Sequence, residues 1–214
     1  MLRAALLALT IGHSVQDRPI VVHKVGPDDA GRKVLVVGSI HGSEGAGIAV
    51  TKRLRSVTPP PGVQLLLIDR ANPDGSRAGT RGNAHGVDLN RNWPLGWRPL
   101  GSIYYSGPRP ASEPETRALR VFILRERPDF SIWFHQHQDL VDLQRGGDQP
   151  LMRDYARIAH MRTGRNPILP GTAARWENRV LPMASAFVVE LAAGALPAWR
   201  IQANVRAVLA MTLH

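Results

Sequence analysis

Four side chains that could bind a metal ion or move a proton stand at the ends of apolar runs in this sequence. They are His41, Glu44, His135 and Glu190. The chain has no cysteine, so any metal must be held by nitrogen and oxygen donors. Such a mixed set without thiolate suits zinc better than magnesium or calcium. Two imidazoles and one carboxylate, with a fourth position left open, form a catalytic type of zinc site.

Each of these residues taken alone also has a structural interpretation. A single histidine after a strand is commonly a hydrogen-bonded structural residue, and a glutamate that ends a strand is commonly solvated. Gly42 and Gly45 flank the His41–Glu44 pair, and a tight turn there would let both side chains face one point. The spacing therefore favours a joint site, and the structural interpretation stays open.

Short apolar runs that alternate with helical patterns predict an α/β sheet flanked by helices. The runs consist almost entirely of Val, Ile, Leu and Phe, which is typical of strands buried on both faces. In open α/β sheets, ligands bind beyond the carboxyl ends of the strands. Parallel strands would therefore bring the four side chains together. The predicted strands are Ile20–Val25, Val34–Ile40, Val63–Ile68, Phe130–Phe134 and Phe187–Leu191.

Helical periodicity fills the intervals between these strands. A capping box of Ser112 and Glu115 is expected to open one helix. The stretch from Asn72 to Tyr105 is rich in Gly, Pro and Asn and shows little periodicity. We interpret it as a long functional loop. The other predicted helices are Gly45–Val57, a stripe from Leu151 to Ala159, and the tail Trp199–Leu213.

The composition limits the class of protein to which this chain can belong. A chain of 214 residues, 43% of them hydrophobic and 21% charged, fits a single globular domain with a full core. The absence of cysteine excludes a disulfide framework and a cysteine nucleophile. The net charge is +10, but no basic run occurs, so we expect no nucleic-acid partner. No apolar stretch approaches the roughly 20 residues of a transmembrane helix.

The first residues resemble the start of a signal peptide. Arg3 precedes the short apolar run Ala4–Leu9, without a clear cleavage site after it. We therefore divide the chain into a truncated signal-like segment, residues 1–12, and a catalytic domain, residues 13–214. This segment favours an extracytoplasmic location slightly and does not exclude the cytoplasm.

An ordered series of motifs resembles the zinc carboxypeptidase family, the funnelin-type peptidases, and within it the short bacterial branch that includes murein peptide amidases. The resemblance runs from about Ser14 to the C-terminus. It implies one domain with a mixed, mostly parallel twisted sheet and an active site at the carboxyl ends of the strands. The motifs are Gly38–Glu44, Asn72–Gly75, Gly86–Pro94, Tyr105–Gly107, Ser112–Thr116, His135 and Val189–Leu191.

The resemblance assigns a role to each matching residue. It implies one Zn²⁺ per chain held by His41, Glu44 and His135, with Glu190 as the general base. Asn90 and Arg91 match the pair that binds the carboxylate of the departing residue, which suits the planar fork of arginine. A hydrogen-bonded loop brace is the alternative for that pair.

The family also uses an arginine to polarise the scissile carbonyl, and Arg81 is the first choice over Arg77. The family's mobile tyrosine has no clear counterpart. Tyr155 falls on a helical stripe and is expected in the core, so Trp176 or His137 would line the site instead. Ala192 also replaces the proline that usually follows the Glu-Leu pair.

The implied activity is zinc-dependent hydrolysis of a C-terminal peptide or amide bond. The substrate would be a peptide with a free carboxylate, such as a murein stem peptide cut at its γ-D-glutamyl–diaminopimelate bond. Two alternatives remain. One is a small-acyl amide deacylase of the aspartoacylase and desuccinylase type, and the other is a non-catalytic cell-wall-binding module.

Overall fold

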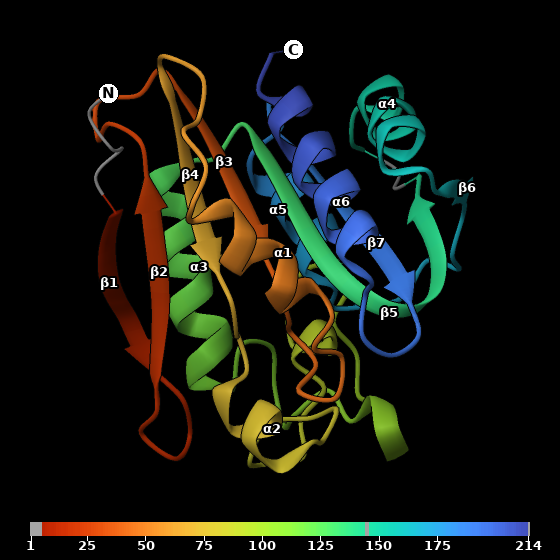
Figure 1. Cartoon of the computed structure of the whole chain (residues 1–214). Helices are drawn as coiled ribbons and strands as arrows, with labels where there is room; N and C mark the ends of the chain where they lie inside the picture. The colour runs from red at the N-terminus through yellow and green to blue at the C-terminus, as the bar shows by residue number, and fades with distance from the viewer. Residues whose placement is uncertain (1–5, 144–145, 214) are drawn as a thin grey trace.

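A mixed sheet forms the centre of the protein (Figure 1). The computed structural model describes residues 6–143 and 146–213. Across these residues the sheet has seven strands. They are β1 (Leu6–His13), β2 (Pro19–Val25), β3 (Arg32–Val37), β4 (Val63–Ile68), β5 (Phe130–Asp142), β6 (Arg162–Gly164) and β7 (Ser185–Ala192).

Helices cover both faces of this sheet, and two 3₁₀ turns lie in the long connection before α3. The helices are α1 (Gly47–Leu54), α2 (Pro73–Ala78), α3 (Pro114–Glu126), α4 (Gln149–Ala159), α5 (Ala173–Val180) and α6 (Ala198–Met211), and the 3₁₀ turns are η1 (Leu89–Arg91) and η2 (Ser102–Tyr104).

The strand order is β1-β2-β4-β3-β5, and β5 pairs with both β6 and β7. The pairs among β3, β4, β5, β6 and β7 are parallel, whereas β1 and β2 are antiparallel to their neighbours. Val37 pairs with Trp133, and His135 pairs with Glu190. The predicted α/β class and mostly parallel sheet are therefore confirmed, and β3, β5 and β7 present their carboxyl ends at one edge.

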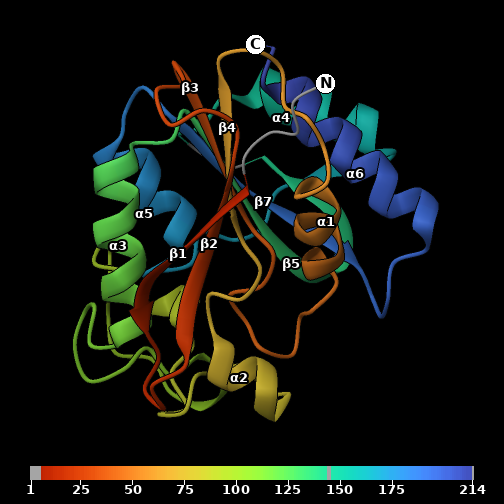
Figure 2. The ribbon, with the colours of Figure 1, turned by 60° about the vertical axis from the view of Figure 1, so that its left-hand side comes forward.

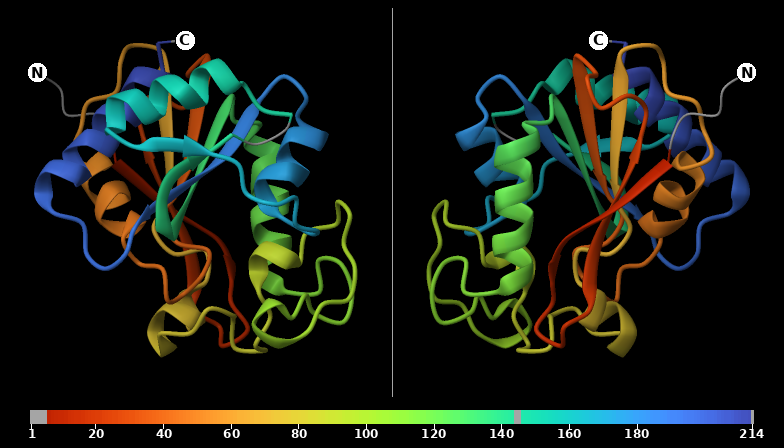
Figure 3. Two further views of the ribbon diagram at one scale, coloured as in Figure 1. Left: turned by 90° about the vertical axis from the view of Figure 1, so that its right-hand side faces the viewer. Right: turned by 90° about the vertical axis from the view of Figure 1, so that its left-hand side faces the viewer.

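Two hydrophobic cores lie on opposite sides of the sheet. Val34 and Val36 of β3 belong to the core under α1, α4 and α6, while Leu35 and Val37 point into the core under α3 and α5. Figures 2 and 3 show these two helical layers on either side of the strands. Burial on both faces explains why these strands read as continuous apolar runs rather than as alternating ones.

Several predicted boundaries were wrong at the carboxyl ends of the strands. β3 ends at Val37, and Gly38–Ile40 belong to the turn that follows. Gly38 still donates to the Ile68 carbonyl of β4 at 2.7 Å, and it lies so close to α1 that an added Cβ would stand 3.1 Å from the Ile48 nitrogen. β5 continues beyond Phe134 to Asp142, so His135 lies within a strand rather than after one.

The predicted capping box was also wrong. Glu113 is the N-cap of α3, and Pro114 takes the first helical position, which its fixed φ favours. The Ser112 hydroxyl donates to the Glu113 carboxylate at 2.6 Å instead of capping the helix. The Glu115 carboxylate accepts a hydrogen bond from the backbone of Val15.

Four elements were not predicted, namely β1, β6, α2 and α5. Residues 6–12 of the signal-like segment lie in β1, which pairs with β2 at the edge of the sheet, and residues 1–5 lie outside the described residues. Within the predicted long loop, Asn72 caps α2 by accepting a hydrogen bond from the Gly75 nitrogen. Among the described residues, no helix combines the length and apolar character that a bilayer crossing needs.

Candidate metal centre and active site

Three side chains converge at the carboxyl edge of the sheet. Nδ1 of His41 lies 2.9 Å from one oxygen of Glu44, and Nδ1 of His135 lies 2.9 Å from the other. The two Nδ1 atoms are 3.2 Å apart. One donor atom from each residue lies within 4.8 Å of the others. These are the three residues for which the resemblance implied a zinc ligand set.

The outward nitrogen of each histidine is also fixed. Nε2 of His41 lies 2.8 Å from the Asp88 carboxylate, and Nε2 of His135 lies 3.2 Å from the Asn90 amide nitrogen. A carboxylate behind a metal-binding histidine fixes its ring and raises its basicity. Burial alone would lower the pKa of His41, but the carboxylates of Asp88 and Glu44 more than offset it and raise that pKa.

The carboxylates in this cluster are held in their charged form. Burial acts to raise the pKa of Glu44, but hydrogen bonds from His135 and His41 hold it well below the usual range. The pKa of Asp88 is lowered in the same way, against its burial, by His41, Arg81 and Arg91. Charged carboxylates are the form that can bind a cation or orient a histidine.

The turn that carries His41 and Glu44 is pressed against α2. A Cβ added to Gly42 would stand 1.9 Å from the carbonyl carbon of Gly75, so only glycine fits this approach. The Gly42 nitrogen also donates to the Arg81 carbonyl at 3.3 Å. The turn, α2 and the segment that carries Arg81 are therefore positioned as one unit.

Glu190 lies beside the metal-binding side chains and is not one of the three that converge. It is 8% exposed, and among the described residues its Oε2 atom has no hydrogen-bond partner. Burial raises the pKa of Glu190, and the nearby charge of Glu44 adds to the increase, while His135 opposes it. A buried carboxylate with one unsatisfied oxygen and a raised pKa is suited to accept and return a proton.

Two arginines stand next to the ligand cluster. Arg81 donates to Glu44 at 3.0 Å and to Asp88 at 2.9 Å. Arg91 is buried and donates through Nη1 to the Asn90 carbonyl at 2.7 Å. The Asn90 side chain is itself a brace, since it accepts from the Ala173 nitrogen at 2.9 Å and meets His135 on its other side.

One cavity of about 580 Å³ is lined by all seven residues expected to bind the metal, catalyse the reaction or bind the substrate. His41, Glu44, His135, Glu190, Arg81, Asn90 and Arg91 line it, whereas Arg77 lies exposed on α2 and does not. The sequence missed several other lining residues, among them Tyr104, Gln136, Arg165 and Arg175. It also missed Asp88, whose only signal was its place two residues before Asn90 in the motif.

The residues considered in place of a mobile tyrosine lie elsewhere. Tyr155 is in the core, as expected, and its hydroxyl donates to Asn204. Trp176 is buried against Trp93 and does not line either cavity. His137 lines the neighbouring cavity. The expectation for Trp176 was therefore wrong.

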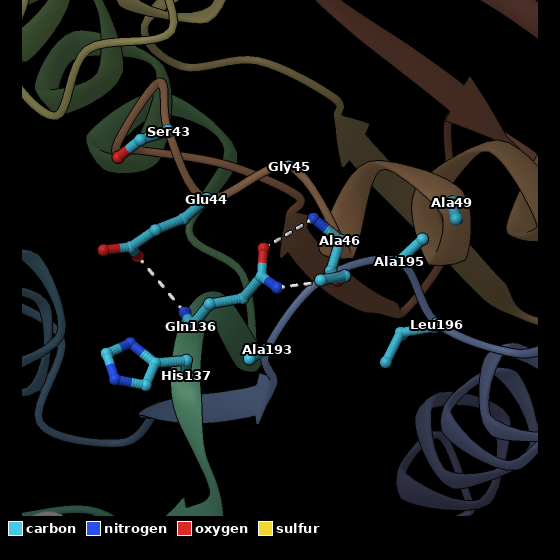
Figure 4. Close-up of a pocket in the computed structure, with 11 residues that line it drawn as sticks. Ser43, Glu44, Gly45, Ala46, Ala49, Gln136, His137, Ala193, Ala195 and Leu196 are labelled. Carbon is cyan, nitrogen blue, oxygen red and sulfur yellow. Dashed lines mark hydrogen bonds between the residues drawn. The ribbon is translucent and has the colours of Figure 1, made fainter.

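This second cavity, of about 630 Å³, begins on the other side of Glu44 and Gln136 and is drawn in Figure 4. The Gln136 side chain crosses it, accepting from the Ala46 nitrogen and donating to the carbonyls of Ala192 and Gly194. Small side chains such as Ala49 and Ala195 line the rest. Glu44 and Gln136 therefore line both cavities.

The donor set fits a zinc ion. Two imidazole nitrogens face each other across one carboxylate, an arrangement that a shared cation satisfies. The Asp88 carboxylate behind His41 is a partner of the kind found behind histidine ligands in protein zinc sites. Fold and cluster together define the class: an α/β protein with a catalytic type of metal centre at the carboxyl edge of its sheet.

Comparison with known proteins identifies the family within this class. Residues 62–203 match the zinc carboxypeptidase family, and the chain belongs to that family. Its members act on peptides. Murein peptide amidase A of Escherichia coli K12 is 34% identical over 116 residues, which cover 47% of this chain and 48% of the relative. The Vibrio campbellii protein of the same name is 33% identical over 157 residues, covering 65% of this chain and 62% of the relative.

The chain thus aligns with about half to three-fifths of the length of these curated relatives. Solved structures extend the likeness of the fold. The murein-tripeptide amidase of E. coli O157 has a TM-score of 0.74 at 24% identity, over 96% of this chain and 90% of that one. Thrombin-activatable fibrinolysis inhibitor reaches 0.81 at 20% identity, over 97% and 67%. A carboxypeptidase A-like fold follows from these matches.

Proposed function

We propose that this protein is a zinc-dependent carboxypeptidase or peptide amidase that releases the C-terminal residue of a peptide. Its substrates would be murein stem peptides cut at the γ-D-glutamyl–diaminopimelate bond. One observation carries the proposal: the ligand cluster, Glu190, Arg81 and Arg91 all line the same cavity. A metal centre, a base and a carboxylate-binding cation are what this hydrolysis requires.

The residues divide the chemistry among them. When bound by His41, Glu44 and His135, zinc supplies a Lewis acid that makes water nucleophilic near neutral pH. Glu190 accepts a proton as the water oxygen attacks the scissile carbonyl carbon. It returns that proton to the departing nitrogen as the C–N bond breaks. Arg81 stabilises the negative charge that develops on the carbonyl oxygen.

Substrate orientation falls to the other side chains. Arg91, with Asn90 behind it, holds the terminal carboxylate so that the scissile bond stays beside Glu190. The part of the substrate before that bond extends into the cavity drawn in Figure 4, which opens on the far side of Glu44.

Two further arginines favour a departing residue that carries a second negative charge. Arg165 and Arg175 line the first cavity and, among the described residues, form no ion pair with a carboxylate. Diaminopimelate carries a second carboxylate at the end of its side chain, which such cations would bind. The names of the E. coli and Vibrio relatives support the same substrate class.

The test is to incubate zinc-loaded protein with a murein tripeptide and with ordinary C-terminal L-peptides, and to identify released amino acids by mass spectrometry. We expect diaminopimelate release from the tripeptide. Release of a small acyl group, or no hydrolysis of any peptide by the zinc-loaded protein, would overturn the proposal.

Glu190→Gln is the matched variant, because glutamine keeps the shape of the side chain but cannot act as the base. We expect zinc content and melting temperature close to those of the unaltered protein. Turnover should fall by about 10²- to 10⁴-fold, the usual cost of losing a positioned acid or base. Loss of zinc in this variant would instead make Glu190 a metal ligand.

A further inference from the structure

The ring of Tyr104 lies against both arginines of the site. Its centroid is 5.2 Å from the Cζ atom of Arg91 and 5.4 Å from that of Arg81. Tyr104 ends the turn η2, is 45% exposed and lines the same cavity as the metal ligands. The ring therefore stands where the cavity meets solvent, directly over the two guanidinium groups.

The two guanidinium groups differ in how firmly other contacts hold them. Arg81 is fixed by Glu44 and Asp88, as described above. Arg91 forms no ion pair within 4.0 Å to any described carboxylate, and the one hydrogen bond from its side chain goes to a backbone carbonyl. Burial lowers the pKa of Arg91, and the positive charge of Arg81 adds to the decrease, while Asp88 opposes it. Arg91 thus has free donors and a like charge nearby.

An aromatic face is suited to hold such a pair. The face of a tyrosine ring carries partial negative charge and attracts a cation placed within about 6 Å of its centre. Both guanidinium groups meet that condition. Unlike a carboxylate, the ring does not use the hydrogen-bond donors of Arg91, so these remain available to a ligand.

Position in the fold singles out Tyr104 among the three tyrosines of the chain. Tyr155 is fully buried in the core, and Tyr105 does not line the cavity. A contact with Arg91 across the mouth of the cavity belongs to Tyr104 alone among these three.

We propose that Tyr104 is a positioning residue for carboxylate binding. Its ring holds the guanidinium group of Arg91 beside that of Arg81, in the place where Arg91 can receive the terminal carboxylate of the substrate. This inference rests on the proposed role of Arg91. It implies that the contribution of Tyr104 to binding depends on the charge of the ligand's terminal group and requires the ring rather than the phenol hydroxyl.

The experiment measures equilibrium binding by calorimetry to the zinc-loaded full chain. The probe is a reduced-amide analogue of the γ-D-glutamyl–diaminopimelate unit, which cannot be hydrolysed. It is used with a free or an amidated α-carboxyl group on the departing residue. The proteins are the unaltered chain, Tyr104→Phe, Tyr104→Leu and Ile103→Ala. Ile103 is the control, because it is the exposed neighbour of Tyr104 and does not line the cavity.

We expect Tyr104→Leu to weaken binding of the free carboxylate by about 3- to 10-fold, because the ligand must then order an Arg91 side chain that the ring no longer holds. Tyr104→Phe and Ile103→Ala should stay within about twofold of the unaltered protein, since phenylalanine keeps the ring face. The amidated probe should bind all four proteins about equally. Because Tyr104 is partly exposed, Tyr104→Leu should fold, and its melting temperature and zinc content provide the check.

Three results would overturn the inference. Tyr104→Leu could leave binding unchanged, it could weaken both probes equally, or Tyr104→Phe could bind as weakly as Tyr104→Leu. The first result would mean that the ring contact has no role in binding. The second would mean that Tyr104 only shapes the cavity, and the third that the hydroxyl rather than the ring is responsible. A chain that binds the probe but hydrolyses no peptide would contradict the proposed function and leave the result for Tyr104 valid. A chain that binds neither probe would overturn both.

Discussion

Asp88 links the ligand cluster to Arg81 and Asn90. It is fully buried, and its two carboxylate oxygens serve three partners. One oxygen meets Nε2 of His41 and the Asn90 backbone, and the other accepts from Arg81. A single side chain therefore sets the orientation of both His41 and Arg81.

Replacing Asp88 with asparagine should separate this role from simple packing. Asp88→Asn keeps the volume but removes the charge that orients His41 and Arg81. Changes to a group directly behind a metal ligand typically lower metal affinity by about 10- to 100-fold. A zinc titration against a competing chelator measures the effect.

Asp74→Asn is the matched control. Asp74 is also buried and paired with an arginine, Arg18, but lies outside the cavity. We expect it to lower stability and leave zinc affinity unchanged. Equal zinc affinity in Asp88→Asn and the unaltered protein would contradict the linking role of Asp88.

Among the elements, the turn after β3 and the helix α2 set the geometry of the ligands. They approach so closely at Gly42 and Gly75 that no side chain fits between their backbones. This contact fixes how far the His41–Glu44 pair lies from the Arg81 segment. The distance from the ligand cluster to the Arg81 segment is therefore set by two packed backbones.

Gly42→Ala tests this contact. Its Cβ would force the turn away from α2, and overpacking of this kind usually costs about 1–3 kcal/mol. We expect a melting temperature lower by about 2–12 °C and a reduced zinc content by elemental analysis. Gly31→Ala provides the control, because an added Cβ there meets nothing within 4 Å. A fully zinc-loaded Gly42→Ala chain of normal stability would show that the turn can move freely.

The central strands were the most predictable elements. β4 spans the same residues as its apolar run, because burial at every position leaves a continuous signal in the sequence. β2 begins one residue before its run, although only three of its seven residues are buried. α5 gave no such signal, since its buried face includes the carboxyl group of Glu177. A buried charge-bearing residue interrupts the apolar period on which a helix prediction depends.

The candidate site was predicted unevenly for a similar reason. His41 and Glu44 stand in one local motif, and His135 directly follows an apolar run, and the structure brings the three together. The contacts of Asp88 with His41, and of Tyr104 with Arg81 and Arg91, depend on how distant segments pack. Nothing in the local sequence encodes those distances, so these two residues became visible only in the folded chain.

In the molecule as a whole, Glu177 joins the sheet to α5 through a fully buried carboxyl group. It accepts hydrogen bonds from the Ser131 hydroxyl and from Nε1 of Trp133. Burial raises the pKa of Glu177 to about 7, although both hydrogen bonds act to lower it. The folded protein therefore binds a proton at Glu177 more tightly than the unfolded chain does.

The consequence is a loss of stability as pH rises. The contribution of Glu177 is fully present below its unfolded pKa of 4.5 and is lost as pH rises through about 7. The largest possible loss is about 3 kcal/mol. Urea unfolding of the unaltered protein and of Glu177→Gln, at pH 5 and pH 8, measures it.

Glutamine can still meet both Ser131 and Trp133 but does not titrate. The unaltered protein should therefore lose more unfolding free energy between pH 5 and pH 8 than Glu177→Gln does. Taking this difference cancels the other titrating groups, such as His41. A difference that is constant between pH 5 and pH 8 would show that Glu177 keeps the same charge in both states.

The separation of the metal ligands along the chain has a kinetic consequence. His41 and His135 are 94 residues apart and meet only after β3 and β5 have paired in parallel. Domains dominated by such long-range pairings fold slowly, typically in milliseconds to seconds. The unfolded chain holds the two histidines too far apart to share an ion. Zinc should therefore stabilise the folded protein by mass action, by about 2.7 kcal/mol at a hundred times its dissociation constant. It would do so by slowing unfolding, because the centre is completed only after the rate-limiting pairing has occurred.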